Sequence, residues 1–202
     1  MRRILSTVAI LAGGLTAAAL LPGVAQANDI YDVIFNSARI TSGGEPGMSR
    51  PARMSAVPRE LVRYGGRERA GTIVINSAER RLYFVLGDGT AIRYGVGVGR
   101  PGFEWGGVKS ITRKAEWPAW TPPPQMLRRR PDLPRFMAGG PSNPLGARAM
   151  YLGGSLYRIH GSNEPHTIGQ AVSSGCIRMT NEDVADLYER VRIGTRVVVI
   201  RG

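Results

Sequence analysis

Short apolar and alternating runs dominate the chain from Gly71 onward. The segment TIVINSAERRLYFVLGDGTAIRYGVGVG contains three β-rich runs, near residues 72–76, 81–86 and 91–98. Asn-Ser separates the first two runs, and Gly-Asp-Gly at 87–89 is a hairpin signal between the second and third. AMYLGG and LYRIH indicate two further strands, and RVVVI indicates a buried one. The pattern predicts a mainly β domain.

One helix is expected before the RVVVI strand. Thr180 and Asn181 have the residue types of a helix start, and Asp183 falls in the first turn. Four apolar residues then follow at i, i+3, i+4 and i+7, namely Val184, Leu187, Tyr188 and Val191. This spacing gives an amphipathic face. Gly-Thr at 194–195 ends the helix, so the domain is expected to hold one or two short helices.

Two segments lack such periodicity. Residues 28–70 are rich in Gly, Pro, Ser, Met and Arg, and we interpret them as a flexible N-terminal extension. Residues 99–147 are dense in Pro and Gly but include Trp105, Trp117 and Trp120. A linker usually lacks tryptophan, so we expect ordered loops that pack over a sheet or line a groove. Core packing is the simpler role for these side chains.

The first 27 residues have the pattern of a secretory signal peptide. Two arginines follow Met1, residues 4–21 are almost wholly apolar or small, and a small-x-small cleavage site lies at 25–27. A glycine pair and a proline interrupt the apolar run, which argues against an uncleaved anchor. No later run approaches the roughly 20 apolar residues of a spanning helix. We therefore expect a periplasmic mature protein without a stable membrane span.

The chain is strongly basic, with a formal net charge of +12 at pH 7. Loss of the two arginines in the signal peptide lowers this charge to +10. The basic residues are scattered apart from a run at 128–130. This balance favours solubility or attraction to anionic surfaces such as membranes and wall polymers. Nucleic acid is not expected as the partner of an exported protein.

Cys176 is the only cysteine, and His160 and His166 are the only histidines. An internal disulfide is excluded, which leaves an inert buried thiol, a metal site or a nucleophile with its base. Three such ligands without nearby acidic partners make a poor zinc site, so no metal or other cofactor is expected. A nucleophilic thiol needs a base or an electropositive setting. His160 at a strand end and Cys176 on a loop could meet at one rim of a sheet.

The motifs around these residues resemble those of a known family. IHG at 159–161 and SSGCIRM at 173–179 are similar to the signature of the YkuD-type L,D-transpeptidase catalytic domain. The similarity extends over residues 71–200 and includes WPAWTPPPQM, NPLGARAMYL and GTRVVVI. It implies an exported bacterial cell-wall enzyme with a β-sandwich-like fold, whose edge forms a cradle that exposes the cysteine.

The resemblance also implies roles for individual residues. Cys176 matches the nucleophile and His160 the general base and acid, and the Gly161 carbonyl would orient the imidazole. Gly175 and Cys176 would supply backbone N–H groups to the oxyanion. The implied substrate-binding residues are Arg178, Ser173, Ser174 and Trp120.

Several of these roles have alternatives. Arg178 has the guanidinium fork that suits a carboxylate, but a structural salt bridge or loop clamp is also open. For Ser173 we favour a loop hydrogen bond. Many family members carry histidine where this chain has Ser174, and this departure leaves proton transfer to His160. His166 is expected on the surface or in the substrate groove.

The implied reaction begins with attack of Cys176 on the diamino acid–D-Ala bond of a peptidoglycan tetrapeptide stem. D-Ala leaves, and the thioester passes to an amine. A stem amine gives a 3→3 cross-link, an outer-membrane protein amine gives a protein anchored to the wall, and water gives an L,D-carboxypeptidase. Carbapenems, as donor mimics, are expected to add to the thiol. The alternatives are another exported cysteine hydrolase and a non-catalytic wall-binding module.

Overall fold

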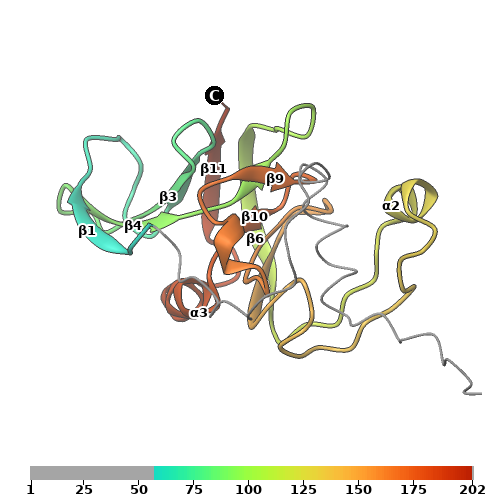
Figure 1. Cartoon of the computed structure of the whole chain (residues 1–202). Coiled ribbons are helices and arrows are strands. Elements are labelled where there is room, and N and C mark those ends of the chain that lie inside the picture. Colours follow the sequence, from blue (N-terminus) through green and yellow to red (C-terminus); the bar gives the residue numbers. More distant parts are fainter. Residues whose placement is uncertain (1–56, 202) are drawn as a thin grey trace, which may run out of the picture.

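Nine strands form one sheet in the structure, a computed structural model that describes residues 57–201 (Figure 1). These strands are Glu60–Arg63 (β1), Ile73–Asn76 (β2), Arg81–Val85 (β3), Thr90–Gly95 (β4), Gly107–Glu116 (β6), Arg148–Leu152 (β7), Arg158–His160 (β8), Ile177–Arg178 (β10) and Arg196–Ile200 (β11). Their order in the sheet is β1-β4-β3-β2-β11-β6-β7-β8-β10. A second sheet pairs Val98–Gly99 (β5) with Ala171–Ser173 (β9). The predicted mainly β fold class is confirmed.

Three short helical segments complete the described part of the chain. They are Pro124–Arg129 (α2), the 3₁₀ turn Pro165–Thr167 (η1) and Asn181–Arg190 (α3). The Thr180 hydroxyl accepts the Asp183 N–H at 3.1 Å and so caps α3 where the sequence predicted its start. None of the helices in residues 57–201 is long and apolar enough to cross a membrane. The expected signal peptide at residues 1–27 lies outside the described residues.

The strand β11 joins the two halves of the large sheet. It pairs in parallel with β2 and antiparallel with β6. Val197 and Val199 are buried in the core, while Arg196 and Ile200 at its ends are exposed. The core also contains Val184 and Leu187 of α3, which packs against β7. The apolar face predicted for this helix is therefore the face that covers the sheet.

Two elements lie inside residues 99–147, where only loops were expected. The ten-residue strand β6 reads GVKSITRKAE, and only Ile111 in it is buried. Its pairing with β11 and β7, and not an apolar period, defines it as a strand. The helix α2 spans six residues with no buried side chain, so it has no amphipathic signal. The prediction of loops is wrong for these two spans.

The strand β1 lies before Gly71, inside the segment expected to be a flexible extension. It pairs antiparallel with β4 over four residues. Three of its side chains are exposed and the fourth is half-buried, so its sequence carries little strand signal. The prediction of a flexible segment is wrong for residues 60–63, and the sheet begins earlier than expected.

Lys114 of β6 closes the C-terminal end of α3. Its Nζ donates to the carbonyls of Tyr188 at 2.6 Å and Val191 at 2.7 Å, and lies 3.9 Å from the Tyr188 ring centroid. These carbonyls lie at the C-terminal end of α3, where backbone carbonyls have no N–H donor within the helix. We expect Lys114→Met to lower the free energy of unfolding by about 1–3 kcal/mol. Urea denaturation measures the loss.

Lys109 provides the matched control, because it lies on the same strand and its ammonium makes no hydrogen bond to a described residue, only ring contacts of 5.7 Å to Trp105 and 5.9 Å to Tyr157. Lys109→Met removes the same charge and should change the free energy of unfolding by about 0.5 kcal/mol or less. Equal losses in the two variants would mean that charge, and not the cap, sets the effect.

Candidate active site

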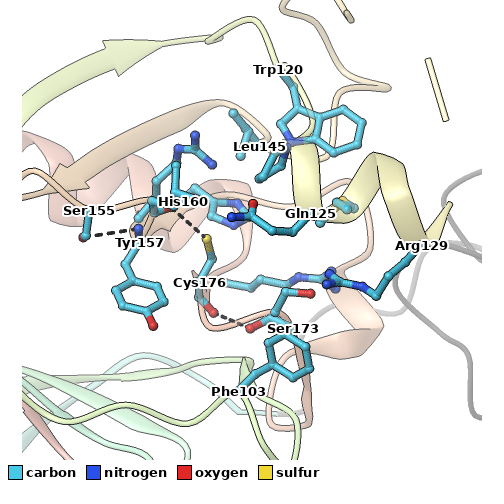
Figure 2. A pocket seen from close by; sticks show the side chains of 16 residues that line it. Phe103, Trp120, Gln125, Arg129, Leu145, Ser155, Tyr157, His160, Ser173 and Cys176 are labelled. Atoms are coloured by element: carbon cyan, nitrogen blue, oxygen red, sulfur yellow. Dashed lines mark hydrogen bonds between the residues drawn. The ribbon is translucent and has the colours of Figure 1, made fainter. Parts of the chain in front are cut away.

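Cys176 and His160 are brought together by neighbouring strands. Cys176 lies in the loop between β9 and β10, and His160 is the last residue of β8. β8 and β10 pair in parallel, with Arg178 opposite His160. Both side chains line one cavity of about 430 Å³, whose lining residues are drawn in Figure 2. The residues that the sequence singled out thus share one site.

The cavity is lined by both apolar and basic side chains. Its larger apolar residues are Phe103, Trp120, Met126, Leu145, Leu156 and Tyr157. Its hydroxyl and basic residues are Ser155, Ser173, Ser174, Arg129, Arg158 and Arg178. No aspartate or glutamate is among the described residues that line it. Positive charge in the site is therefore not cancelled by an acid within the cavity.

The imidazole of His160 is fixed by the next residue along the chain. His160 is 3% exposed, and its Nδ1–H donates to the Gly161 carbonyl at 2.5 Å. A carbonyl can only accept, so Nδ1 carries the proton and Nε2 keeps its lone pair. Gly161 has no room for a side chain, because a Cβ there would lie 2.3 Å from Asn181 Oδ1. The predicted carbonyl contact is present in the structure.

Burial lowers the pKa of His160 to about 3, and the charges of Arg178 and Arg158 act in the same direction. The hydrogen bond to the Gly161 carbonyl opposes them. Protonation would place a positive charge on a buried ring that is close to two arginines, and both factors disfavour it. The imidazole is therefore neutral at physiological pH and available as a proton acceptor.

Cys176 is half-buried, and its Sγ lies 3.7 Å from the Leu156 carbonyl. Burial raises the pKa of the Cys176 thiol, while the charges of Arg158 and Arg178 and hydrogen bonding to Arg158 pull it down in part. With His160 neutral, the resting pair is a thiol and an imidazole, both uncharged. The two arginines favour the thiolate once it forms.

The loop before the nucleophile is held by Ser173. Its Oγ donates to the Cys176 carbonyl at 2.6 Å and accepts the Gly175 N–H at 3.1 Å. Gly175 is thus engaged, although its N–H was expected to face the oxyanion. The N–H of Cys176 has no hydrogen-bond partner among residues 57–201. Of the two expected donors, the one on Cys176 is free to meet a substrate.

Trp105 holds the same loop from the other side. Its Nε1–H donates to the Gly175 carbonyl at 2.7 Å, and its ring stacks on Tyr157 with centroids 4.4 Å apart and planes at 6°. Gly175 has φ of +102°, and a Cβ there would lie 2.6 Å from the Tyr157 ring. Only glycine fits this conformation and this approach. The carbonyl side of the Gly175–Cys176 peptide is therefore fixed by Trp105.

Arg178 is a buried residue of the cavity lining. It is 1% exposed, and its Nη1 lies 3.1 Å from Glu164 Oε2 and 3.3 Å from Thr167 Oγ1. Burial lowers the pKa of Arg178 to about 10, and the charge of Glu164 opposes that shift. The salt bridge that the sequence left open is thus present, and Arg178 also lines the cavity.

The remaining predicted residues fall into two groups. Ser174 lines the cavity, and its Oγ accepts from Arg100 Nη1 at 3.2 Å. Trp120 is 3% exposed and both lines the cavity and packs with Leu133 and Leu145. His166 lies in η1, is exposed, and is not among the described lining residues. Its expected surface position agrees with the structure.

Sequence reasoning missed Arg158 beside the nucleophile. Arg158 precedes His160 by two positions in β8, and residues two apart in a strand share a face. That alternation could have pointed to it. Phe103 lies in a Pro- and Gly-rich loop and gave no comparable signal, while Trp105 was expected in an ordered loop but without a link to the nucleophile.

Comparison with known proteins supports the resemblance. The family model of the YkuD-type L,D-transpeptidase catalytic domain matches residues 70–199. The probable L,D-transpeptidase ErfK/SrfK of Escherichia coli (strain K12) is 37% identical over 176 residues, 83% of this chain and 55% of that protein. The probable L,D-transpeptidase YbiS of the same strain is 42% identical over 137 residues, 63% of this chain and 44% of that protein. The chain thus spans about half the length of these relatives.

Solved structures share the fold at low sequence identity. An L,D-transpeptidase from Mycobacterium smegmatis superposes with a TM-score of 0.52 at 16% identity, over 64% of this chain and 58% of that one. The L,D-transpeptidase LdtMt1, in complex with imipenem, does so with a TM-score of 0.50 at 14% identity, over 64% and 58%. With a family match over most of the described residues, this chain belongs to the L,D-transpeptidase family of the YkuD type.

Proposed function

We propose that this protein is a peptidoglycan L,D-transpeptidase that acts through a thioester on Cys176. The observation that carries this proposal is the single cavity that joins the thiol to a neutral, carbonyl-oriented His160. A nucleophile and base held in reach of one substrate are what acyl transfer requires. We also propose that residues 1–27 export the protein to the periplasm.

Acylation starts from the uncharged pair. Sγ of Cys176 attacks the carbonyl carbon of the diamino acid in the donor stem while Nε2 of His160 takes the thiol proton. The oxyanion lies toward the free N–H of Cys176. The imidazolium then returns the proton to the nitrogen of D-Ala as the C–N bond breaks, and the thioester remains.

The second half of the reaction transfers the acyl group to an amine. His160, neutral again, removes a proton from the acceptor amine as it attacks the thioester, and Cys176 leaves. A stem amine gives a cross-link, and an amine of an outer-membrane protein gives a covalent anchor. Water in the same place gives a carboxypeptidase.

The cavity walls supply the binding groups of this proposal. Trp120 offers an apolar surface, and Ser174 offers a hydroxyl beside the nucleophile. Arg178 keeps its bond to Glu164 and contributes positive charge next to Cys176. The related LdtMt1 binds imipenem, and we propose that carbapenems acylate Cys176 here, which intact-mass measurement would detect.

Product analysis tests the proposal. The protein and its Cys176→Ala variant are each incubated with purified disaccharide-tetrapeptide, and the masses of the products are measured by mass spectrometry. A dimer lighter than two substrates by one D-Ala, absent with the variant, supports cross-linking. Tripeptide alone supports acylation with water as the acceptor, the hydrolase alternative. Unchanged substrate, with binding that does not depend on Cys176, would leave the non-catalytic wall-binding module.

Trp105 offers a separate test of the oxyanion arrangement. Trp105→Phe keeps an aromatic ring against Tyr157 but removes the N–H that holds the Gly175 carbonyl. We expect kcat/KM for acylation to fall about 5- to 30-fold, the range of one lost hydrogen bond of about 1–2 kcal/mol. Stopped-flow measurement of carbapenem acylation reports this rate.

Two controls separate positioning from general damage. Trp117 is exposed and does not line the cavity, so Trp117→Phe should acylate at the parent rate. Iodoacetamide needs no oxyanion, so its reaction with Cys176 should be unchanged in Trp105→Phe. A matching loss in alkylation would indicate a displaced thiol and contradict the positioning role.

A further inference from the structure

Two arginines lie beside Phe103, which lines the cavity together with one of them, Arg129. Cζ of Arg100 lies 4.2 Å from the centroid of the Phe103 ring, and Cζ of Arg129 lies 5.6 Å from it. Arg100 follows β5, and Arg129 ends α2, so the two come from distant parts of the chain. In Figure 2, the Arg129 side chain points from α2 toward Ser173 and Phe103. Both guanidinium groups are therefore close to the nucleophile loop.

Neither guanidinium is neutralised. Two nearby arginines have a carboxylate partner, since Arg178 has Glu164 and Arg130 has Asp132. Arg100 and Arg129 form no ion pair with a described residue, and no described acid lines the cavity. The hydrogen bond from Arg100 to the Ser174 hydroxyl brings no negative charge. Arg129 in the cavity lining and Arg100 beside the lining residue Ser174 thus carry two positive charges without an acidic partner among the described residues.

The two charges also act on each other. Burial lowers the pKa of Arg100, and the charge of Arg129 is the second cause in the same direction. Like charges repel, and an anion that contacts both guanidinium groups offsets this repulsion. The planar guanidinium fork presents two parallel N–H groups that fit a carboxylate. An organic anion with a carboxylate is the ligand that these residues match.

We propose that Arg100 and Arg129 form a carboxylate-binding subsite that selects donor stems by the ionised state of a carboxyl group near the bond attacked by Cys176. This inference rests on the proposed function. Ser174, which Arg100 contacts, precedes Cys176 by two residues, so the bound carboxylate lies close to the scissile bond. Two carboxylates of a stem qualify, that of the terminal D-Ala and a free side-chain carboxyl on the diamino acid. A stem amidated at the recognised group would be a poor donor.

The experiment uses three tetrapeptide stems: the free acid, the C-terminal amide and the side-chain amide. Isothermal titration calorimetry measures their Kd with the Cys176→Ala protein, and turnover is measured in parallel with Cys176 present. We expect one of the two amides to bind about 10- to 100-fold more weakly than the free acid, as for loss of a charge-assisted hydrogen bond. The amide that binds poorly identifies the carboxylate.

Arg129→Gln should then weaken binding of the free acid by a similar factor and leave the Kd of the poorly binding amide unchanged. Arg128→Gln is the matched control. Arg128 is the preceding residue of α2, is exposed and does not line the cavity, so this change should alter the Kd of neither the free acid nor that amide. Equal Kd values for all three stems, with Cys176-dependent turnover intact, would overturn the subsite and leave the proposed function standing. Absence of Cys176-dependent turnover of every stem would overturn the proposed function, and the subsite with it.

Discussion

Cys176→Ala is expected to abolish acyl transfer while the folded structure is retained. The sulfur is the only thiol of the chain, so no other residue can form the thioester. Loss of a covalent nucleophile lowers kcat by roughly 10⁴-fold or more. The readouts are dimer and tripeptide formation from disaccharide-tetrapeptide, and the mass adduct with a carbapenem.

The fold should tolerate this change, because the half-buried thiol makes only weak polar contacts, one of 3.7 Å to the Leu156 carbonyl and others with Arg158. We expect the free energy of unfolding to stay within about 0.5 kcal/mol of the parent. Cross-linked product from the alanine variant at even a hundredth of the parent rate would contradict a cysteine mechanism.

His160→Ala is expected to lower kcat/KM for acylation about 10²- to 10⁴-fold, the range for a general base. Because its folded pKa is depressed to about 3, His160 stays neutral as pH falls from 8 to 5. The parent rate should therefore be flat across this interval and show no loss near pH 6.5, the ordinary pKa of histidine. In the variant, the Cys176 thiol must lose its proton to solvent before it attacks, so the acylation rate should rise with pH. Carbapenem acylation rates between pH 5 and 9 test both profiles.

The second histidine supplies the control for this prediction. His166 is exposed and outside the described cavity lining, so His166→Ala should keep the parent rate and profile. An acid limb near pH 6.5 in the parent would show that His160 titrates normally and acts in an ion pair with the thiolate. A larger loss from His166 than from His160 would show that the base is misassigned.

The fold was predictable where burial leaves a period in the sequence. The strand β3 and the helix α3 alternate or repeat because one face of each meets the core, and β2 is a continuous apolar run because both of its faces are buried. β6 lacks such a pattern: its neighbours in the sheet hold it through backbone hydrogen bonds, which any side chain permits. The same reason hides β1, whose side chains are mostly exposed.

The candidate site was predictable where its residue types are rare and close in sequence. One thiol and two imidazoles within 17 residues drew attention to Cys176 and His160. Trp105 and Arg100 could not be found this way, because hydrogen bonds that span about 70 residues connect them to the nucleophile loop. Arg178 shows the converse limit: its residue type allows both a substrate contact and an ion pair, and only the folded chain shows Glu164 beside it.

The central position of β11 has a consequence for when reactivity appears. Residues 57–178 already contain Cys176, His160 and every residue named at the cavity. They also contain both halves of the sheet, β1-β4-β3-β2 and β6-β7-β8-β10, but not the strand that joins them. A chain emerging from the ribosome therefore carries its thiol before it can complete the sheet. Synthesis order thus delays assembly of the nucleophile's surroundings until residues 196–200 have emerged.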